Sequence, residues 1–244
     1  MTPYYSDSLV TIYHGDCREL LPSIEADAIV TDPPYGIGWG RATWPDDPEA
    51  YPELIRWLVS EGNRVGGWCF VFQSQINVGH FHEWFPDGWR IFAACKNFAQ
   101  VAKTGLWRAW DPVVYWNSGP NSGPNSTTVN RDYHVGNVAG LFRHSAGHPS
   151  PRPVDTMRHI VGIAAAEGQT VVDPFAGSGT TLRAAKDMNR RAIGIEIEER
   201  YCEVAARRCS QEVLGLETTR APDGREHKCS ACGGPGKAKD QTAW

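Results

Sequence analysis

The residue pattern with the clearest chemical meaning is an acid, two prolines and an aromatic residue in succession, Asp32-Pro33-Pro34-Tyr35. It follows the apolar run 28–31, which predicts a strand, so Asp32 is expected at the carboxyl edge of a sheet, and the prolines restrict the backbone after it. An aromatic amine is a poor nucleophile, and accepting hydrogen bonds from both its N–H groups localises its lone pair. Asp32 and the Pro33 carbonyl are suitable acceptors, and Tyr35 offers a stacking surface. The set predicts a pocket for methylation of an aromatic amine; a plain turn with Asp32 capping a helix is the alternative.

A second motif, Asp173-Pro-Phe-Ala-Gly-Ser-Gly-Thr-Thr181, joins a predicted strand to a predicted helix. Its glycines, Gly177 and Gly179, allow the backbone to approach a ligand that a Cβ atom would displace. A phosphate-binding loop would have lysine directly after the last glycine, at position 180, and a dinucleotide fingerprint would have a third glycine at position 182. The chain has Thr180 and Leu182 instead, which argues against both nucleotide motifs.

An acidic residue follows this motif at the end of the next predicted strand. Glu196 lies about 20 residues further on, where an acid in doubly wound folds accepts hydrogen bonds from ribose hydroxyls. The ligand is therefore expected to contain a ribose. The alternative is a tight turn at the glycines and a solvated strand end at Glu196.

The elements that must position these residues alternate between strand and helix, which predicts an α/β fold with a doubly wound, mostly parallel sheet. Ligands in such folds bind at the carboxyl ends of the strands, where four acids are expected: Asp16, Asp32, Asp173 and Glu196. Strands are predicted at 9–13, 28–31, 68–72, 90–94, 112–116, 170–172 and 192–195. Helices are predicted at 18–21, 52–59 with Gly62 beyond the end, 76–85, 154–167, 180–188 and 199–213. Residues 117–147 are predicted to be a long loop region, either a substrate-recognition segment or a floppy insertion.

Length and composition favour one domain, residues 1–215, followed by a polar, flexible tail, 216–244. No signal peptide or membrane span is expected, and the protein is expected in the cytoplasm. The net charge is -4, yet residues 88–152 hold seven Lys or Arg and two Asp or Glu. Aromatic residues lie within that basic segment, a pattern typical of nucleic-acid binding although local charge can also serve solvation alone. They are Trp107, Trp110, Tyr115, Trp116 and Tyr133.

These motifs together resemble the DNA amino-methyltransferases, specifically their permuted β group, in which the DPPY motif precedes the glycine-rich motif. The matching segments are GDC at 15–17, TDPPYG at 31–36, HPSPRP at 148–153, DPFAGSGTT at 173–181 and IGIEIEERY at 193–201. The resemblance implies a target-recognition region at about 98–147. It also implies that a flipped base in double-stranded DNA receives a methyl group from S-adenosylmethionine.

The same resemblance assigns roles to single residues. Asp32, Pro33, Pro34 and Tyr35 would hold the target amine, Glu196 the cofactor ribose, and Asp16 the cofactor adenine. The family commonly has lysine at the position of Arg152, a change that keeps the charge but alters the geometry. The cofactor pocket would be lined by Asp173, Phe175, Gly177, Ser178, Gly179 and Thr180.

Within the family, aspartate rather than serine before Pro-Pro-Tyr favours adenine N6 over cytosine N4. A catalytically inactive DNA-binding relative is the alternative of another class, whereas protein glutamine methyltransferases have asparagine in place of Asp32. A homodimer and a partner nuclease are further expectations. Cys229 and Cys232 supply half of a zinc site, so no metal site is predicted.

Overall fold

The computed structural model describes residues 1–38, 46–101, 107–119, 131–137 and 152–211, and residues 1–213 form one compact unit. The predicted tail lies outside the described residues, as does most of the predicted recognition region. In the described ranges, no helix is both long and apolar enough to cross a membrane.

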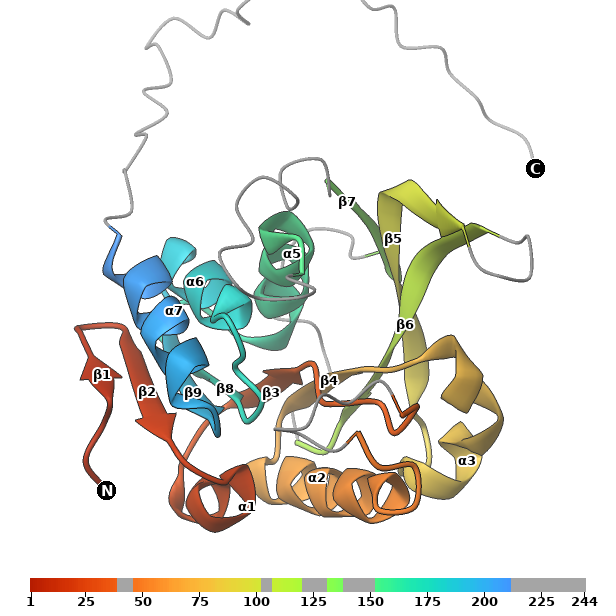
Figure 1. Cartoon of the computed structure of the whole chain (residues 1–244), viewed down its shortest axis with the longest axis horizontal. Helices are drawn as coiled ribbons and strands as arrows, with labels where there is room; N and C mark the ends of the chain where they lie inside the picture. Colours follow the sequence, from red (N-terminus) through yellow and green to blue (C-terminus); the bar gives the residue numbers. More distant parts are fainter. Residues whose placement is uncertain (39–45, 102–106, 120–130, 138–151, 212–244) are drawn as a thin grey trace, which may run out of the picture. The chain divides into compact units, whose positions relative to one another are not determined.

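A nine-stranded mixed sheet forms the centre of the described residues, in the order β1-β2-β9-β8-β3-β4-β6-β5-β7 (Figure 1). Five neighbouring strands, β2, β9, β8, β3 and β4, run parallel. The edge strand β1 and the pairs β4–β6 and β5–β6 are antiparallel, while β7 runs parallel to β5. The strands are β1 (Tyr5–Ser6), β2 (Val10–His14), β3 (Ala28–Thr31), β4 (Trp68–Phe72), β5 (Arg90–Val101), β6 (Trp107–Asn117), β7 (Tyr133–Gly136), β8 (Thr170–Asp173) and β9 (Arg191–Glu196).

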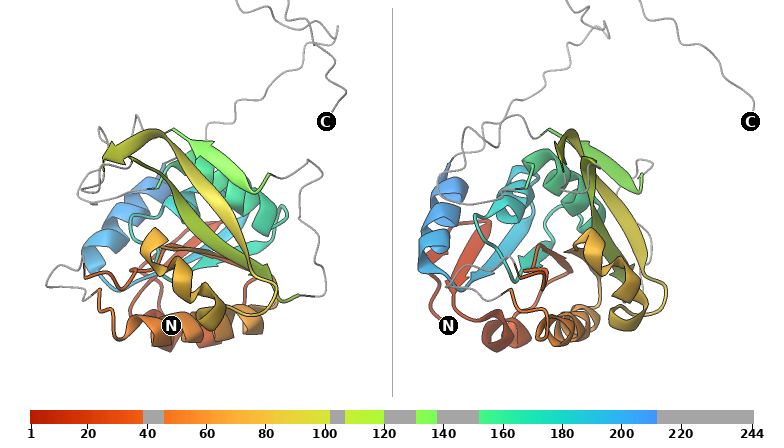
Figure 2. Two further views of the ribbon diagram at one scale, coloured as in Figure 1. Left: turned by 90° about the vertical axis from the view of Figure 1, so that its right-hand side faces the viewer. Right: turned by 45° about the vertical axis from the view of Figure 1, so that its right-hand side comes forward.

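Helices cover both faces of the sheet, which confirms the predicted doubly wound α/β class (Figure 2). One face carries α5 (Val154–Ala164), α6 (Thr180–Asp187) and α7 (Glu199–Ser210). The other carries α1 (Cys17–Leu20), α2 (Tyr51–Val65) and α3 (Phe81–Trp84), with the 3₁₀ segments η1 (Leu21–Ser23) and η2 (Gln75–His80).

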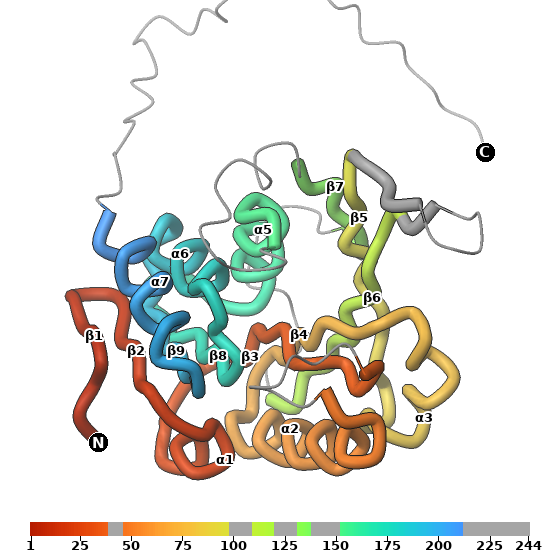
Figure 3. Tube along the Cα trace, in the orientation of Figure 1, coloured from red at the N-terminus to blue at the C-terminus, as the bar shows by residue number. Residues whose placement is uncertain are grey.

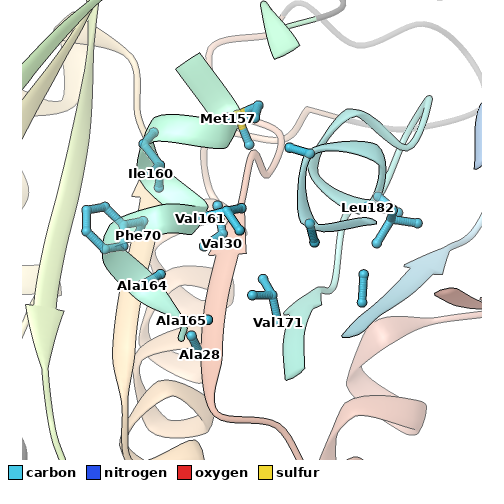
Figure 4. Close-up of a cluster of buried hydrophobic side chains, with 14 of the residues drawn as sticks. Ala28, Val30, Phe70, Met157, Ile160, Val161, Ala164, Ala165, Val171 and Leu182 are labelled. Atoms are coloured by element: carbon cyan, nitrogen blue, oxygen red, sulfur yellow. The ribbon is translucent and has the colours of Figure 1, made fainter. Parts of the chain in front are cut away.

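The core on the α5–α7 face is made of aliphatic side chains from strand centres and helix stripes (Figure 4). Val30 lies beside Val161 of α5, and Val171 of β8 and Leu182 of α6 belong to the same cluster, all fully buried. Each such side chain contributes about 1.5–3 kcal/mol on burial. This core holds β3 and β8 side by side, and both predicted motifs follow directly from those two strands.

Three sequence predictions of local structure need correction. Helix α2 runs through Gly62 and ends at Val65, capped by Gly66, whose φ is +74°. A Cβ at Gly62 would lie 2.7 Å from the Trp116 ring, so Gly62 permits close packing instead of ending the helix. The helix predicted at 76–85 is mostly 3₁₀, and a strand, β7, interrupts the loop predicted at 117–147. Helices α2 and α3 and strand β7 can be located in Figure 3.

Candidate active site

The carboxyl ends of the five parallel strands bring the predicted acids to one edge of the sheet. Asp173 and Glu196 are the last residues of β8 and β9, while Asp16 and Asp32 follow the ends of β2 and β3. Strands β2, β9, β8 and β3 are consecutive neighbours in the sheet. The expected convergence of the four acids at this edge is therefore confirmed.

We call residues 173–181, between β8 and α6, the glycine loop. Its backbone is held by Glu196, whose Oε2 accepts a hydrogen bond from the Gly177 N–H at 2.7 Å. The other oxygen, Oε1, accepts from the Glu198 N–H at 2.8 Å. Burial raises the pKa of Glu196, although these backbone donors favour its charged form. A carboxylate has about four acceptor positions, so two bonds leave capacity for ribose hydroxyls.

Gly179 has a structural role that the sequence analysis did not foresee. Its φ is +75°, and a Cβ there would lie 2.8 Å from the Cβ of Ala205 on α7. The missing side chain therefore allows α7 to pack against the start of α6, whereas the sequence analysis attributed both glycines to approach of a ligand. Gly177, with a φ of +50°, faces Glu196 as described above.

The buried hydroxyls of the glycine loop face an arginine. Ser178 and Thr180 accept hydrogen bonds from Nη1 of Arg208, at 3.1 and 2.5 Å. Burial lowers the pKa of Arg208, and nearby Arg183 lowers it further. Arg208 comes from the last turn of α7, 28 residues beyond Thr180. No sequence motif identified this contact.

Asp173 joins the glycine loop to the neighbouring strand. Its Oδ1 accepts from the Thr31 hydroxyl at 2.6 Å and from the Phe175 N–H at 3.1 Å. Burial raises its pKa to about 6, against opposing hydrogen bonds from Thr181, Thr31 and the Phe175 backbone. Thr31 immediately precedes Asp32, so this bond ties the two motifs together at the sheet edge. The Phe175 side chain is partly buried against the core on the α1–α3 face.

Asp16 lies beside the end of β9 and is engaged locally. Its Oδ1 accepts from the Arg18 N–H at 2.8 Å, which caps α1, and its Oδ2 pairs with the Arg18 guanidinium at 2.7 Å. The preceding Gly15 N–H donates to the Glu196 carbonyl at 3.0 Å. The structure thus brings Asp16 close to the strand that carries Glu196, as predicted, with Arg18 as its ion-pair partner.

We call residues 32–38 the proline loop. The Tyr35 hydroxyl donates to Asp32 Oδ1 at 2.5 Å, and the Asn77 side chain donates to the Tyr35 carbonyl at 2.9 Å. Pro33 is buried and Pro34 partly exposed. Asp46, which is buried, accepts from the N–H groups of Gly36 and Ile37.

The proline loop also depends on residues that sequence reasoning missed. Asn77 and Asp46 belong to no motif, and no local sequence pattern marked either of them. Gly36 of TDPPYG has a φ of +63°, and a Cβ there would lie 2.4 Å from the Cβ of Tyr51 on α2. The loop is thus fixed against α2 and η2 before any substrate binds.

A charged network surrounds Asp32. Arg152 Nε donates to Asp32 Oδ2 at 2.6 Å, and Nη2 donates to Oδ1 at 3.1 Å. The same guanidinium contacts the Tyr35 hydroxyl and forms an ion pair with Asp111, which also binds Lys96 at 2.9 Å. In the sequence, Arg152 stood out only because the resembling family commonly has lysine at that position. In the structure it lies beside the proline loop, two residues before α5.

One aromatic residue of the basic segment cannot contact a nucleic acid, because Trp116 is buried in the core. Tyr115 is half-buried and stacks on Phe70 with ring centres 5.2 Å apart. Trp110 and Tyr133 are 36% and 41% exposed and keep surface for a partner. The Trp107 side chain lies outside the described residues, as do Cys229 and Cys232.

The sequence matches the model of the DNA methylase family over residues 71–207, which is more than half of the chain. A second model, the RMKL-like methyltransferase domain, matches residues 3–96. The chain is 34% identical to the putative methylase YubD of Escherichia coli, over 86% of this chain and 94% of that protein. It is 27% identical to the type II methyltransferase M.ScaI of Streptomyces caespitosus, covering 88% and 86%, and 26% identical to the DNA adenine methyltransferase YhdJ of E. coli, covering 84% of each.

Solved structures share the fold at lower identity. The complex of M1.HpyAVI with S-adenosylmethionine has a TM-score of 0.62 and 22% identity, covering 82% of this chain and all of that one. The cytosine-N4-specific PvuII DNA methyltransferase has a TM-score of 0.66 and 18% identity, covering 86% and 89%. The chain therefore belongs to the DNA methylase family and is an enzyme that transfers methyl groups from S-adenosylmethionine to DNA.

Proposed function

We propose that the enzyme methylates the N6 amino group of adenine in double-stranded DNA at a specific sequence, and that the proline loop holds this amine. The observation that carries the proposal is the Thr31–Asp173 hydrogen bond of 2.6 Å, which keeps the residue before Asp32 in contact with the glycine loop. A methyl donor on the glycine loop and an amine at Asp32 would then be neighbours, as direct transfer needs.

The cofactor residues in this proposal come from the glycine loop and the two strands beside it. Glu196 receives the ribose hydroxyls, and Asp16 contacts the adenine moiety. The backbone of Gly177 and Gly179 and the side chains of Asp173, Phe175, Ser178 and Thr180 shape the pocket. S-adenosylmethionine supplies an electrophilic methyl group on a sulfonium, an excellent leaving group.

The target residues raise the reactivity of the amine by accepting its N–H groups. Asp32 accepts one hydrogen bond and the Pro33 carbonyl the other, which localises the nitrogen lone pair, while the Tyr35 ring contacts the base. The nitrogen becomes positively charged as the new N–C bond forms. The negative charge of Asp32 stabilises that charge at the stage where it develops, and the excess proton leaves afterwards.

Aspartate at position 32 is the feature that favours adenine over cytosine. Relatives of both kinds are similar to the chain: YhdJ is named an adenine methyltransferase, and the PvuII enzyme acts on cytosine N4. Cytosine N4 is therefore the alternative target. We also assign the enzyme to the permuted β group, because Asp32-Pro-Pro-Tyr35 precedes the glycine loop in the chain.

The setting of the activity follows from the relatives. Several of them are type II methyltransferases of bacteria, so we propose a cytoplasmic enzyme that protects or marks its host's DNA. A partner nuclease and a homodimer stay predictions from the sequence.

The test is to incubate the purified protein with unmodified DNA and labelled S-adenosylmethionine, digest the DNA to nucleosides and identify the labelled one. Label in N6-methyl-2′-deoxyadenosine supports the proposal, and label only in N4-methyl-2′-deoxycytidine contradicts it. Long-read mapping of the modified bases in the same DNA gives the recognition sequence. The Asp32→Ala variant, with unchanged cofactor binding, is the control for adventitious methylation.

A further inference from the structure

The side chain of Arg152 lies where the proposed function places the target amine, and the inference below rests on that function. Its guanidinium donates to both carboxylate oxygens of Asp32, at 2.6 and 3.1 Å, and contacts the Tyr35 hydroxyl. Its Cζ lies 4.6 Å from the centre of the Phe72 ring. Only 14% of the side chain is exposed. Arg152 is thus a planar, conjugated N–H donor, close to an aromatic ring and bonded to the proposed acceptor.

An adenine amino group has the same chemical character. It is planar, conjugated with its ring and offers N–H donors, so it would use the same carboxylate. Asp32 already accepts three hydrogen bonds, two from Arg152 and one from the Tyr35 hydroxyl, so most of the roughly four acceptor positions of its carboxylate are occupied and Arg152 holds two of them. Arg152 and the target amine therefore compete for the Asp32 carboxylate.

The charge that develops during methyl transfer also disfavours the Asp32–Arg152 pair. The amine enters neutral and becomes cationic as the N–C bond forms. A guanidinium held on the same carboxylate would repel that charge and cancel the field of Asp32 in a site with little water. Transfer is favoured when Asp32 is free of Arg152.

Asp111 provides a second anchor for Arg152. Nη1 of Arg152 already forms an ion pair with Asp111 on β6. Lys96 on the neighbouring strand β5 holds Asp111, with Nζ 2.9 Å from Oδ2 and 3.0 Å from Oδ1. Burial alone would raise the pKa of Asp111, but Arg152 and Lys96 outweigh it and the pKa is lowered. The anchor is therefore ionised and fixed to the sheet.

We propose that Arg152 is a positioning residue that substitutes for the target amine when no base is bound. Without a base, Arg152 neutralises Asp32 and keeps the proline loop in its binding geometry. When the base enters, the hydrogen bonds from Arg152 to Asp32 break and its ion pair with Asp111 remains. Asp111 is the residue that makes this release favourable. The pair Arg152–Asp111 thereby couples base entry to the exposure of a reactive carboxylate.

The proposal predicts the sign of an interaction between two substitutions. Asp111→Asn removes the second anchor, so Arg152 holds Asp32 more firmly and single-turnover methyl transfer at saturating DNA and cofactor falls by about tenfold. Arg152→Met keeps a long apolar side chain but removes the donors and the charge. Introduced into the Asp111→Asn protein, it restores the rate by about tenfold, because nothing then competes for Asp32.

The assay uses the full chain, labelled S-adenosylmethionine and a duplex that carries the mapped recognition sequence. Arg158→Met is the matched control, since Arg158 is half-exposed on α5, the helix that follows Arg152, and pairs with Asp187 away from the proline loop. Cofactor affinity and thermal stability are measured for every variant, so that a folding defect or cofactor loss is recognised and the rate is compared only among folded, saturated proteins. The assay counts transferred methyl groups whichever base receives them. A cytosine product would therefore contradict the proposed function but leave the comparison among these variants valid.

A double variant that transfers methyl groups faster than Asp111→Asn alone supports the proposal. A double variant equal to or slower than Asp111→Asn overturns it, because Arg152 would then be needed on Asp32 during transfer. Two single variants with Asp111 intact give a second test. If Arg152→Met transfers methyl groups more slowly than the parent while Arg152→Lys keeps the parental rate, a fixed positive charge beside Asp32 is required during transfer. That result would overturn the proposed release of Arg152 from Asp32.

Discussion

The glycine loop and the proline loop lie side by side at one edge of the sheet, but different interactions hold them. The glycine loop is organised by backbone donors, hydroxyls and two buried acids, Asp173 and Glu196, and its contacts reach α7 through Gly179 and Arg208. The proline loop is surrounded by full charges, with Asp32, Arg152, Asp111 and Lys96 in one network. The first arrangement suits a ligand that stays in place while it reacts. The second suits an amine that must enter, become charged and leave.

Gly179→Ala is expected to cause the largest loss of stability on the glycine-loop side. The φ of +75° disfavours alanine, and the new Cβ would lie 2.8 Å from the Cβ of Ala205, so unfolding free energy should fall by about 3 kcal/mol. Denaturant unfolding measures this change. Ala206→Gly is a control on α7, next to Ala205 but without the contact to Gly179, and it is expected to lower the unfolding free energy by about 1 kcal/mol. A variant as stable as the parent would show that α7 does not restrict this glycine.

Gly36→Ala is the corresponding change in the proline loop. Alanine at a φ of +63° is strained, and its Cβ would lie 2.4 Å from Tyr51 Cβ, so a loss of similar size, about 3 kcal/mol, is expected. The two glycine variants should differ in function. At temperatures where both variants are folded, Gly36→Ala should slow methyl transfer and leave cofactor affinity near normal, while Gly179→Ala should weaken cofactor binding. Isothermal titration measures the affinity, and single-turnover assays measure the rate. Equal effects of the two variants on affinity and rate would contradict the assignment of the glycine loop to the cofactor and of the proline loop to the amine.

Asp173 makes stability depend on pH. Its pKa in the folded protein, about 6, is above the ordinary 3.8, so the folded state binds more protons than the unfolded state between those values. Stability is therefore expected to fall as pH rises from about 4 to 6, by about 2–3 kcal/mol from this group. Asp173→Asn should flatten the profile over that window, whereas the exposed Asp87→Asn should not. An unchanged slope in Asp173→Asn would contradict the raised pKa.

Glu196→Gln is expected to have the smallest effect and the most specific one. One oxygen becomes an NH₂ group that cannot accept a backbone N–H, so the cofactor dissociation constant should rise by about tenfold. The transfer rate at saturating cofactor should stay close to that of the parent. A fall in that rate with unchanged affinity would assign Glu196 to the reaction instead of the ribose.

Local sequence predicted the parts of the site that are contiguous in the chain. Strand β3 was predicted with its observed bounds, and the acids at the ends of β3, β8 and β9 were identified because an apolar run followed by a polar residue marks a strand end. Gly36 and Gly179 were visible as glycines, but their packing partners, Tyr51 and Ala205, were not. A side-chain contact across many residues has no local pattern.

The charged network around Asp32 shows most clearly what local sequence could not predict. Arg152 and Asp32 are 120 residues apart, and Asp111 is 41 residues from Arg152. Pairing of these residues depends on β6 lying beside β4 and on the start of α5 reaching the sheet edge, which only the folded chain determines. The basic, aromatic segment misled for a similar reason: Trp116 is buried where β6 pairs with β4, opposite Cys69, whereas Trp110 lies beyond that pairing, opposite Cys95 of β5, and stays exposed.

Single-turnover methyl transfer by Asp32→Ala, at a cofactor concentration that saturates its own measured binding, tests the division between the two loops most directly. The structure predicts a cofactor dissociation constant close to that of the parent and a transfer rate lower by at least about a hundredfold, because only the amine loses its acceptor. Transfer at the parental rate, or a loss that follows entirely from weaker cofactor binding, would contradict the assignment of Asp32 to the target base.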